Sequence, residues 1–161
     1  MASRAGASAP LTHRGDLVGR HADALARRLH SPLLLAPGTY REFRAPLAAY
    51  DASPRARKAL ELLAELAVLL KLPVRVLTVT ENGEEGKAHL AEARSELAAR
   101  GLAATGTARG GEPDEAILAE IGEGADLVAM GAHGHGRIVE LVLGSTTDRV
   151  LRRSAVPVLC A

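Results

Sequence analysis

The segment Met130-Gly-Ala-His-Gly-His-Gly-Arg-Ile-Val-Glu-Leu-Val-Leu-Gly-Ser-Thr-Thr147 combines spaced glycines with a hydroxyl-rich end. Gly131 and Gly134 are separated by two residues, Gly134 and Gly144 by nine, and Ser145 follows directly. Glycines leave backbone N–H groups accessible, and a helix that begins here presents further N–H groups at the positive end of its dipole. On spacing alone, the segment fits either a phosphate cradle or a glycine-rich turn with an ordinary helix cap.

Short apolar runs alternate with amphipathic stretches on either side of this segment. We expect five strands, at Leu47–Asp51, Val74–Val79, Leu102–Ala108, Leu127–Met130 and Val156–Cys160. The four intervening helices are expected after Ser53-Pro54, over Lys87–Arg100, through Ile117 and Ile121, and over Thr146–Arg153 with Ser145 as N-cap. The Asn82-Gly83 pair is interpreted as a turn.

This alternation predicts an α/β fold with an open five-stranded parallel sheet, strand order 3-2-1-4-5, and helices on both faces. Ligands of such sheets bind beyond the carboxyl ends of the strands, where the strand order reverses. Here that position lies between the first and fourth strands, which end at Asp51 and Gly131. We therefore expect Asp51 and the glycine-rich segment that begins at Gly131 to meet at one crevice.

Residues 1–45 stand outside the alternation and contain an echo of the carboxyl-terminal region. Residues 125 positions apart match in type: Gly19 with Gly144, Asp23 with Asp148, Arg27 and Arg28 with Arg152 and Arg153, Pro32 with Pro157, and Leu34 with Leu159. Chance similarity between Ala/Leu/Arg-rich helices is the alternative. The echo predicts a helix followed by a strand at 32–36 that pairs antiparallel with Val156–Cys160 and covers that sheet edge. The sequence leaves open whether this pairing is within one chain or between two chains of a swapped dimer.

Composition narrows the classes of function. A net charge of +1 and only 2% aromatic residues disfavour nucleic acid as a partner, because such proteins use basic surfaces and stacking rings. No apolar run approaches the ~20 residues that span a bilayer, so no membrane partner is expected. With one cysteine, Cys160, and no signal-like apolar start, we expect a reducing, cytoplasmic location.

The pattern G-x2-G-x9-G-[S/T] between the fourth strand and the last helix resembles the ATP-binding signature of the universal stress protein family. Three more stretches resemble this family: Pro46-Leu-Ala-Ala-Tyr-Asp-Ala-Ser53, Ala125-Asp-Leu-Val-Ala-Met-Gly131 and Ser154-Ala-Val-Pro-Val-Leu159. The resemblance implies a stress-response domain at 46–161, preceded at 1–45 by the end of a truncated first domain. It also implies a homodimer as a candidate assembly, because last strands pair edge to edge in the family.

The resemblance also assigns roles to individual residues. Asp51 would contact the adenosine part, Val79 would line the adenine pocket and offer backbone hydrogen bonds, and Met130 would lie near ribose and adenine. The phosphates and ribose would be surrounded by Gly131, His133, Gly134, Gly144, Ser145 and Thr146. The implied ligand is ATP, or ADP or AMP, with Mg²⁺ accompanying the nucleotide. Tyr50 and Ala52 depart from the pattern, since a smaller residue and Gly are common at these positions.

Other chemistries are less well supported by the residues. Asp51 has the alternative role of capping the turn before Pro54, and the His133-x-His135 pair lacks the Cys or acidic partners of a metal site. Ser145, His133 and Asp148 are the residue types of a hydrolase triad, but the nucleophile-elbow pattern is missing. We therefore expect an ATP-binding regulatory module with no catalytic residue and at most weak ATPase activity. A slow adenine-nucleotide phosphohydrolase and a nucleotide-free structural partner remain the alternatives.

Overall fold

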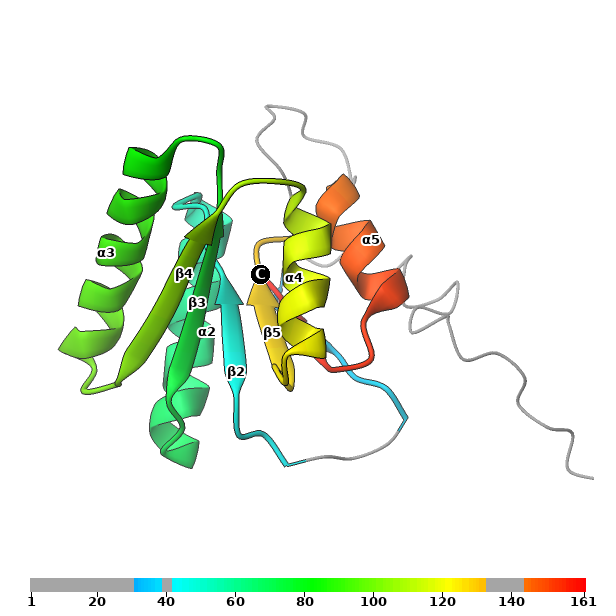
Figure 1. The fold of residues 1–161 in the computed structure, drawn as a ribbon. Helices are drawn as coiled ribbons and strands as arrows, with labels where there is room; N and C mark the ends of the chain where they lie inside the picture. Colours follow the sequence, from blue (N-terminus) through cyan, green and yellow to red (C-terminus); the bar gives the residue numbers. More distant parts are fainter. Residues whose placement is uncertain (1–30, 39–41, 133–143) are drawn as a thin grey trace, which may run out of the picture.

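The structure is a computed structural model that describes residues 31–38, 42–132 and 144–161. Its strands are β1 (Leu33–Leu35), β2 (Pro46–Ala49), β3 (Val74–Val79), β4 (Ala104–Arg109), β5 (Leu127–Met130) and β6 (Val158–Cys160). Its helices are α2 (Pro54–Leu70), α3 (Gly83–Ala99), α4 (Pro113–Gly122) and α5 (Ser145–Arg153). Figure 1 shows the helices packed on both faces of the sheet.

The six-stranded sheet has the order β1-β6-β5-β2-β3-β4. Strands β2 to β6 run parallel in the predicted order, and β1 is added antiparallel at the β6 edge. Leu34 lies opposite Leu159, which confirms the predicted contact between 32–36 and the last strand. The helix expected before β1 falls outside the described residues.

Two apolar cores lie on the two faces of the sheet. Side chains alternate between faces along a strand, so Leu47 and Leu77 pack toward α4 and α5, whereas Ala48 and Val76 pack toward α2 and α3. The largest fully buried side chains come from both cores, and each such burial stabilises the fold by roughly 1.5–3 kcal/mol.

Local signals explain where the helices begin and end. Ser53 caps α2 with Pro54 in its first turn, as predicted, and Lys71 ends it in the left-handed region with φ 56°. Asn82 and Gly83 are not a free turn: Asn82 Oδ1 accepts hydrogen bonds from Glu84 N–H (3.1 Å) and Glu85 N–H (3.3 Å), so α3 begins earlier than expected. Gly101, with φ +76°, ends α3 as predicted.

Ion pairs connect α4 to the sheet and to α5. The buried Glu120 carboxylate accepts hydrogen bonds from Arg75 of β3 and from Arg109 of β4, the latter at 2.8 Å. Asp114, also buried, pairs with Arg149 of α5 at 3.3 Å. A buried carboxylate is tolerated because it is paired, and these pairs tie α4 to β3 and β4 through Glu120 and to α5 through Asp114.

Candidate functional site

A crevice of about 560 Å³ opens at the carboxyl ends of β2, β3 and β5. Seven of the nine residues predicted to bind nucleotide line it: Asp51, Val79, Met130, Gly131, Gly144, Ser145 and Thr146. The other two, His133 and Gly134, lie outside the described residues. Val79 ends β3 and Gly131 follows β5, so these two predicted binding residues come from different βα units. The fold places them at the same crevice.

One wall of the crevice is apolar. It is formed by side chains on the α4 and α5 face of the sheet: Ala49, Leu77, Val79, Ile117 and Met130. Leu77, Ile117 and Met130 are almost fully buried, which keeps the wall rigid. Aliphatic walls of this kind suit a flat heteroaromatic ring, and none of these five residues is aromatic.

The backbone of Val79 faces the gap beyond β2. Peptide groups alternate sides along a strand, and Val74 and Thr80 donate N–H bonds to the β4 side, at Ala103 O (3.1 Å) and Arg109 O (3.0 Å). The N–H and C=O of Val79 therefore point toward β2, which ends at Ala49. A donor and an acceptor side by side at the crevice match the edge of a purine that carries an acceptor beside an amino group.

The opposite end of the crevice is the first turn of α5. Gly144 is the N-cap, with extended φ −57° and ψ 149°, and Ser145 is the first helical residue rather than the predicted cap. Within the described ranges no side chain caps this helix. The N–H groups of its first turn, together with the exposed Ser145, therefore face the crevice and favour an anion.

Two hydrogen bonds hold this turn against the end of β5. Gly144 N–H donates to Ala132 O at 3.3 Å, and Thr147 Oγ1 donates to Gly131 O at 3.2 Å. A Cβ on Gly131 would lie 3.1 Å from the backbone N of Ala56, a tight contact, so the absence of a side chain here favours close packing against α2. Gly131 thus has a structural role besides its place in the crevice.

Asp51 forms the turn that precedes α2 and also lines the crevice. Its Oδ1 accepts a hydrogen bond from Ser53 N–H at 3.0 Å, which forms the turn into α2, and the exposed side chain also lines the crevice. Ala52, between them, has φ 57°. The left-handed region favours glycine, so this is the physical reason that an alanine is unusual at this point of the turn.

Tyr50 directs its side chain away from the apolar wall, into the core under α2 and α3. Its hydroxyl donates to Glu92, which also accepts a 2.7 Å hydrogen bond from Arg57 Nε. Burial, followed by the contact with Glu92, raises the pKa of Tyr50 well above its usual value. The hydrogen bonds from Arg57 and then Tyr50 lower the pKa of Glu92. Tyr50 is therefore fixed as a neutral hydrogen-bond donor.

Sequence reasoning missed a second, polar wall of the crevice. Thr80, Glu85 and His89 line this side, with Thr80 Oγ1 donating to Glu85 Oε2 at 2.9 Å. His89 packs edge-on against Tyr50, with ring centroids 6.5 Å apart, and its buried Nδ1 has no hydrogen-bond partner among the described residues. The sequence signal for this wall was Asn82 with Glu85 three residues later, the spacing of a helix N-terminus.

The described residues show neither a metal cluster nor a membrane-spanning element. Within 31–38, 42–132 and 144–161, no three His, Cys, Asp or Glu side chains are grouped so as to hold a metal ion. None of the helices in this part of the chain combines the length and apolar character needed to cross a bilayer.

Comparison with known proteins points to one family. The sequence model of the universal stress protein family matches residues 42–161. A universal stress protein of Synechocystis is 35% identical over 145 residues, 88% of this chain and 50% of its own length. One from Thermus aquaticus is 36% identical over 133 residues, 73% of this chain and 97% of its own length. This chain thus spans about half of the first relative and nearly all of the second.

Solved structures agree with this result. A universal stress protein from Archaeoglobus fulgidus superposes with a TM-score of 0.76 at 27% identity, covering 91% of this chain and 57% of that one. A universal stress protein in complex with cAMP has a TM-score of 0.62 at 26% identity, covering 75% and 98%. A third, from Archaeoglobus fulgidus in complex with dAMP, has a TM-score of 0.59 at 25% identity, covering 74% and 97%.

Proposed function

We propose, on the premise that this chain belongs to the universal stress protein family, that its crevice binds an adenine nucleotide, with ATP as the ligand. Binding would act as a regulatory signal in a stress response, with little or no turnover. The observation that carries the proposal is one crevice that joins the Val79 peptide, Asp51 and the first turn of α5, which no described side chain caps. Related proteins in complex with cAMP and dAMP support the same class of ligand.

The two ends of the crevice suit the two ends of a nucleotide. Adenine would lie on the aliphatic wall with its N1 and amino group against the N–H and C=O of Val79, and Asp51 would accept from the ribose. The phosphates would lie at Ser145 and Thr146, where N–H groups and hydroxyls donate. Guanine presents the reverse donor and acceptor at this edge, so we expect ATP to bind at least tenfold more tightly than GTP.

Little or no hydrolysis is expected from the same geometry. Asp51, the one carboxylate at the end of β2, is already engaged in the turn with Ser53 N–H. A base that activates water needs to lie within hydrogen-bond reach of its target, and we assign no described residue to that role. Phosphate release measured over hours with MgATP tests this part and separates the proposal from a slow phosphohydrolase.

The binding proposal is tested by isothermal titration of ATP, GTP and adenosine into the unaltered chain and into Ser145→Asp. An acidic residue in the first turn stabilises a helix, so this variant should keep its fold while repelling phosphate. We expect ATP affinity to fall by about a hundredfold, ~2.8 kcal/mol, and adenosine affinity to change little.

The matched control is Gly83→Asp, which adds the same charge to the first turn of α3. A Cβ at Gly83 meets nothing within 4 Å, and this residue does not line the crevice. ATP should bind this variant as it binds the unaltered chain. If the unaltered chain does not bind ATP, the proposal is wrong and the nucleotide-free alternative remains. If Ser145→Asp and Gly83→Asp lose equal ATP affinity, the phosphate position assigned to α5 is wrong.

A further inference from the structure

The polar wall of the crevice offers hydrogen-bond acceptors for which the described residues supply too few donors. Thr80 Oγ1 accepts from Asn82 N–H at 3.2 Å and donates its one proton to Glu85 Oε2 at 2.9 Å. Glu85 Oε1 lies 4.0 Å from His89 Nε2, which is too far for a hydrogen bond. Within the described part of the chain this oxygen therefore has no donor, and an N–H group of a ligand would suit it.

These acceptors lie at the carboxyl end of β3, close to the peptide group that we assign to the base. Strand β3 ends at Val79 and α3 begins at Gly83, so the first turn of α3 lies at this end of the sheet. Thr80 and Glu85 line the same crevice as Val79. The Glu85 side chain is 49% exposed, so a ligand in the crevice can reach its carboxylate.

The direction of the chain places the amino group of a bound adenine on the side of Thr80. Within a residue the N–H precedes the C=O, so the N–H of Val79, assigned to adenine N1, lies nearer Thr78. The C=O of Val79, assigned to the amino group, lies nearer Thr80. The amino group has two N–H donors, and only one of them points to the Val79 C=O. The other points away from N1, toward the side of the polar wall.

We propose that Glu85 is a specificity-determining residue whose Oε1 accepts the second N–H of the adenine amino group, while Thr80 holds its other oxygen in place. The inference rests on the proposed function and extends base recognition to a residue of α3. An N–H that donates to a carboxylate forms a charge-assisted hydrogen bond. A purine without the amino group would leave both Glu85 Oε1 and the Val79 C=O without a donor, which disfavours its binding.

The contact is tested by comparing ATP with purine riboside 5′-triphosphate, which has a hydrogen in place of the amino group. Both ligands are titrated calorimetrically into the unaltered chain and into Glu85→Ala. We expect the unaltered chain to bind ATP about a hundredfold more tightly than the analogue, and Glu85→Ala to reduce this affinity ratio about tenfold. The ratio isolates the contact, because a change in the fold or in the charge near the phosphates affects both ligands alike.

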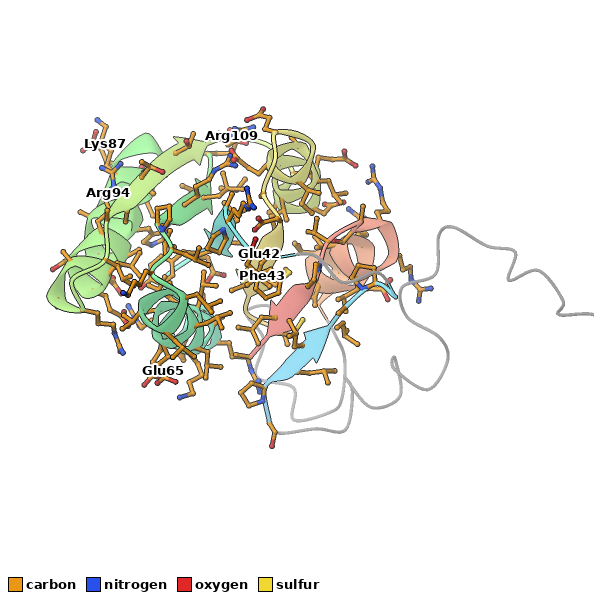
Figure 2. The ribbon with its side chains drawn as sticks, turned by 90° about the horizontal axis from the view of Figure 1, so that it is seen from below. Glu42, Phe43, Glu65, Lys87, Arg94 and Arg109 are labelled. Carbon is orange, nitrogen blue, oxygen red and sulfur yellow. The ribbon has the colours of Figure 1, made fainter. Side chains whose placement is uncertain are left out.

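The matched control is Glu84→Ala, which removes an acidic residue from the same first turn of α3. The Glu84 side chain is 85% exposed, pairs with Lys87 at 2.7 Å and does not line the crevice. Figure 2 shows Lys87 on the outer side of α3. This variant should keep the affinity ratio of the unaltered chain.

The positioning role of Thr80 is tested with Thr80→Ser and Thr80→Val. Serine keeps the hydroxyl that donates to Glu85 Oε2, whereas valine removes it with little change in shape. We expect Thr80→Ser to keep the affinity ratio and Thr80→Val to reduce it about threefold. An equal ratio in these two variants would overturn the role given to Thr80.

The outcomes separate this inference from the proposed function. The same affinity ratio in the unaltered chain and in Glu85→Ala would overturn the inference and leave adenine nucleotide binding intact. A ratio that falls as far in Glu84→Ala as in Glu85→Ala would also overturn it. If neither ligand binds the unaltered chain, the proposed function fails and the inference fails with it.

Discussion

Two helices begin at the same crevice, and they satisfy their first N–H groups differently. At α2, Ser53 supplies its own cap, with Ser53 Oγ accepting from Ala56 N–H at 3.1 Å, and Pro54 removes one N–H altogether. At α5, the N-cap is Gly144, which has an extended backbone but no side chain to offer. Both Ser53 and Gly144 line the crevice.

The difference separates a structural helix end from one available to a ligand. In a capped helix, a side chain already accepts a hydrogen bond from an N–H group of the first turn. In a helix without such a cap, these N–H groups and the partial positive charge of the helix end are available to an anion. The chain therefore gives up about a few tenths of a kcal/mol of capping stability at α5, where the N-cap is glycine. This loss is explained if a phosphate group completes the helix end when nucleotide is bound.

Among changes to the helix caps and the turn beside them, the largest effect is expected from giving α5 the cap that α2 already has. Gly144→Ser places a hydroxyl at an extended N-cap position, where it can accept from the N–H of the second or third helical residue. ATP affinity measured by calorimetry should fall about tenfold, ~1.4 kcal/mol, while the melting temperature without ligand rises. Unchanged affinity together with raised stability would show that these N–H groups do not bind the ligand.

The converse substitution, Ser53→Ala, removes the cap of α2. Because Ala56 N–H then loses its partner, we expect a loss of about 1 kcal/mol in the free energy of unfolding. Urea denaturation measures this loss. If ATP affinity fell more than in Gly144→Ser, the division of roles between the two helices would be wrong.

A smaller gain in stability is expected from Ala52→Gly in the turn that leads into α2. Ala52 has φ 57°, a conformation that costs a residue with a Cβ roughly 1 kcal/mol and costs glycine almost nothing. Part of the gain is offset by the greater freedom of glycine in the unfolded chain, so about 0.5 kcal/mol should remain. Destabilisation in urea would refute the assigned backbone conformation.

The smallest effect is expected in the pH dependence of stability, through Glu92, which accepts a hydrogen bond from Tyr50. The pKa of Glu92 is lowered by hydrogen bonds from Arg57 and then Tyr50, so ionised Glu92 stabilises the folded state above the ordinary carboxyl pKa of ~4.3. This contribution is lost as the pH falls through the lowered value. It is small because the carboxylate is half-exposed.

Glu92→Gln should therefore reduce stability slightly at neutral pH and flatten its decline in acid. The measurement is the urea midpoint as a function of pH for both chains. Equal slopes in the acid range would contradict the role given to this carboxylate.

Much of the fold could be predicted because its signals are local. Strands β3 and β5 have the predicted bounds, and Ser53-Pro54 marks the start of α2. The β1–β6 contact followed from a repeat of sequence rather than from any property of Pro32 to Ala36 alone. Ser145 was misplaced by one position, because a hydroxyl residue after glycine fits both the cap and the first helical turn.

The site was predicted only in part, because the position of some lining residues depends on tertiary packing. Gly131 and Gly144 carry a spacing pattern, but His89 and Ile117 lie inside helices that look like ordinary amphipathic segments. Their place at the crevice depends on how α3 and α4 rotate and pack against the sheet. For α4, the ion pairs of Glu120 and Asp114 help to set this packing. No local pattern carries that information.

The most direct test follows individual amides by NMR while ATP is added to the ¹⁵N-labelled chain. The N–H signals of Ser145 and Thr146 should move most, with that of Val79, whereas Ala56 N–H, held by Ser53 Oγ, should move much less. Largest shifts at Ala56, or no shift at the first turn of α5 with saturating ATP, would contradict the claim that this open helix end binds phosphate.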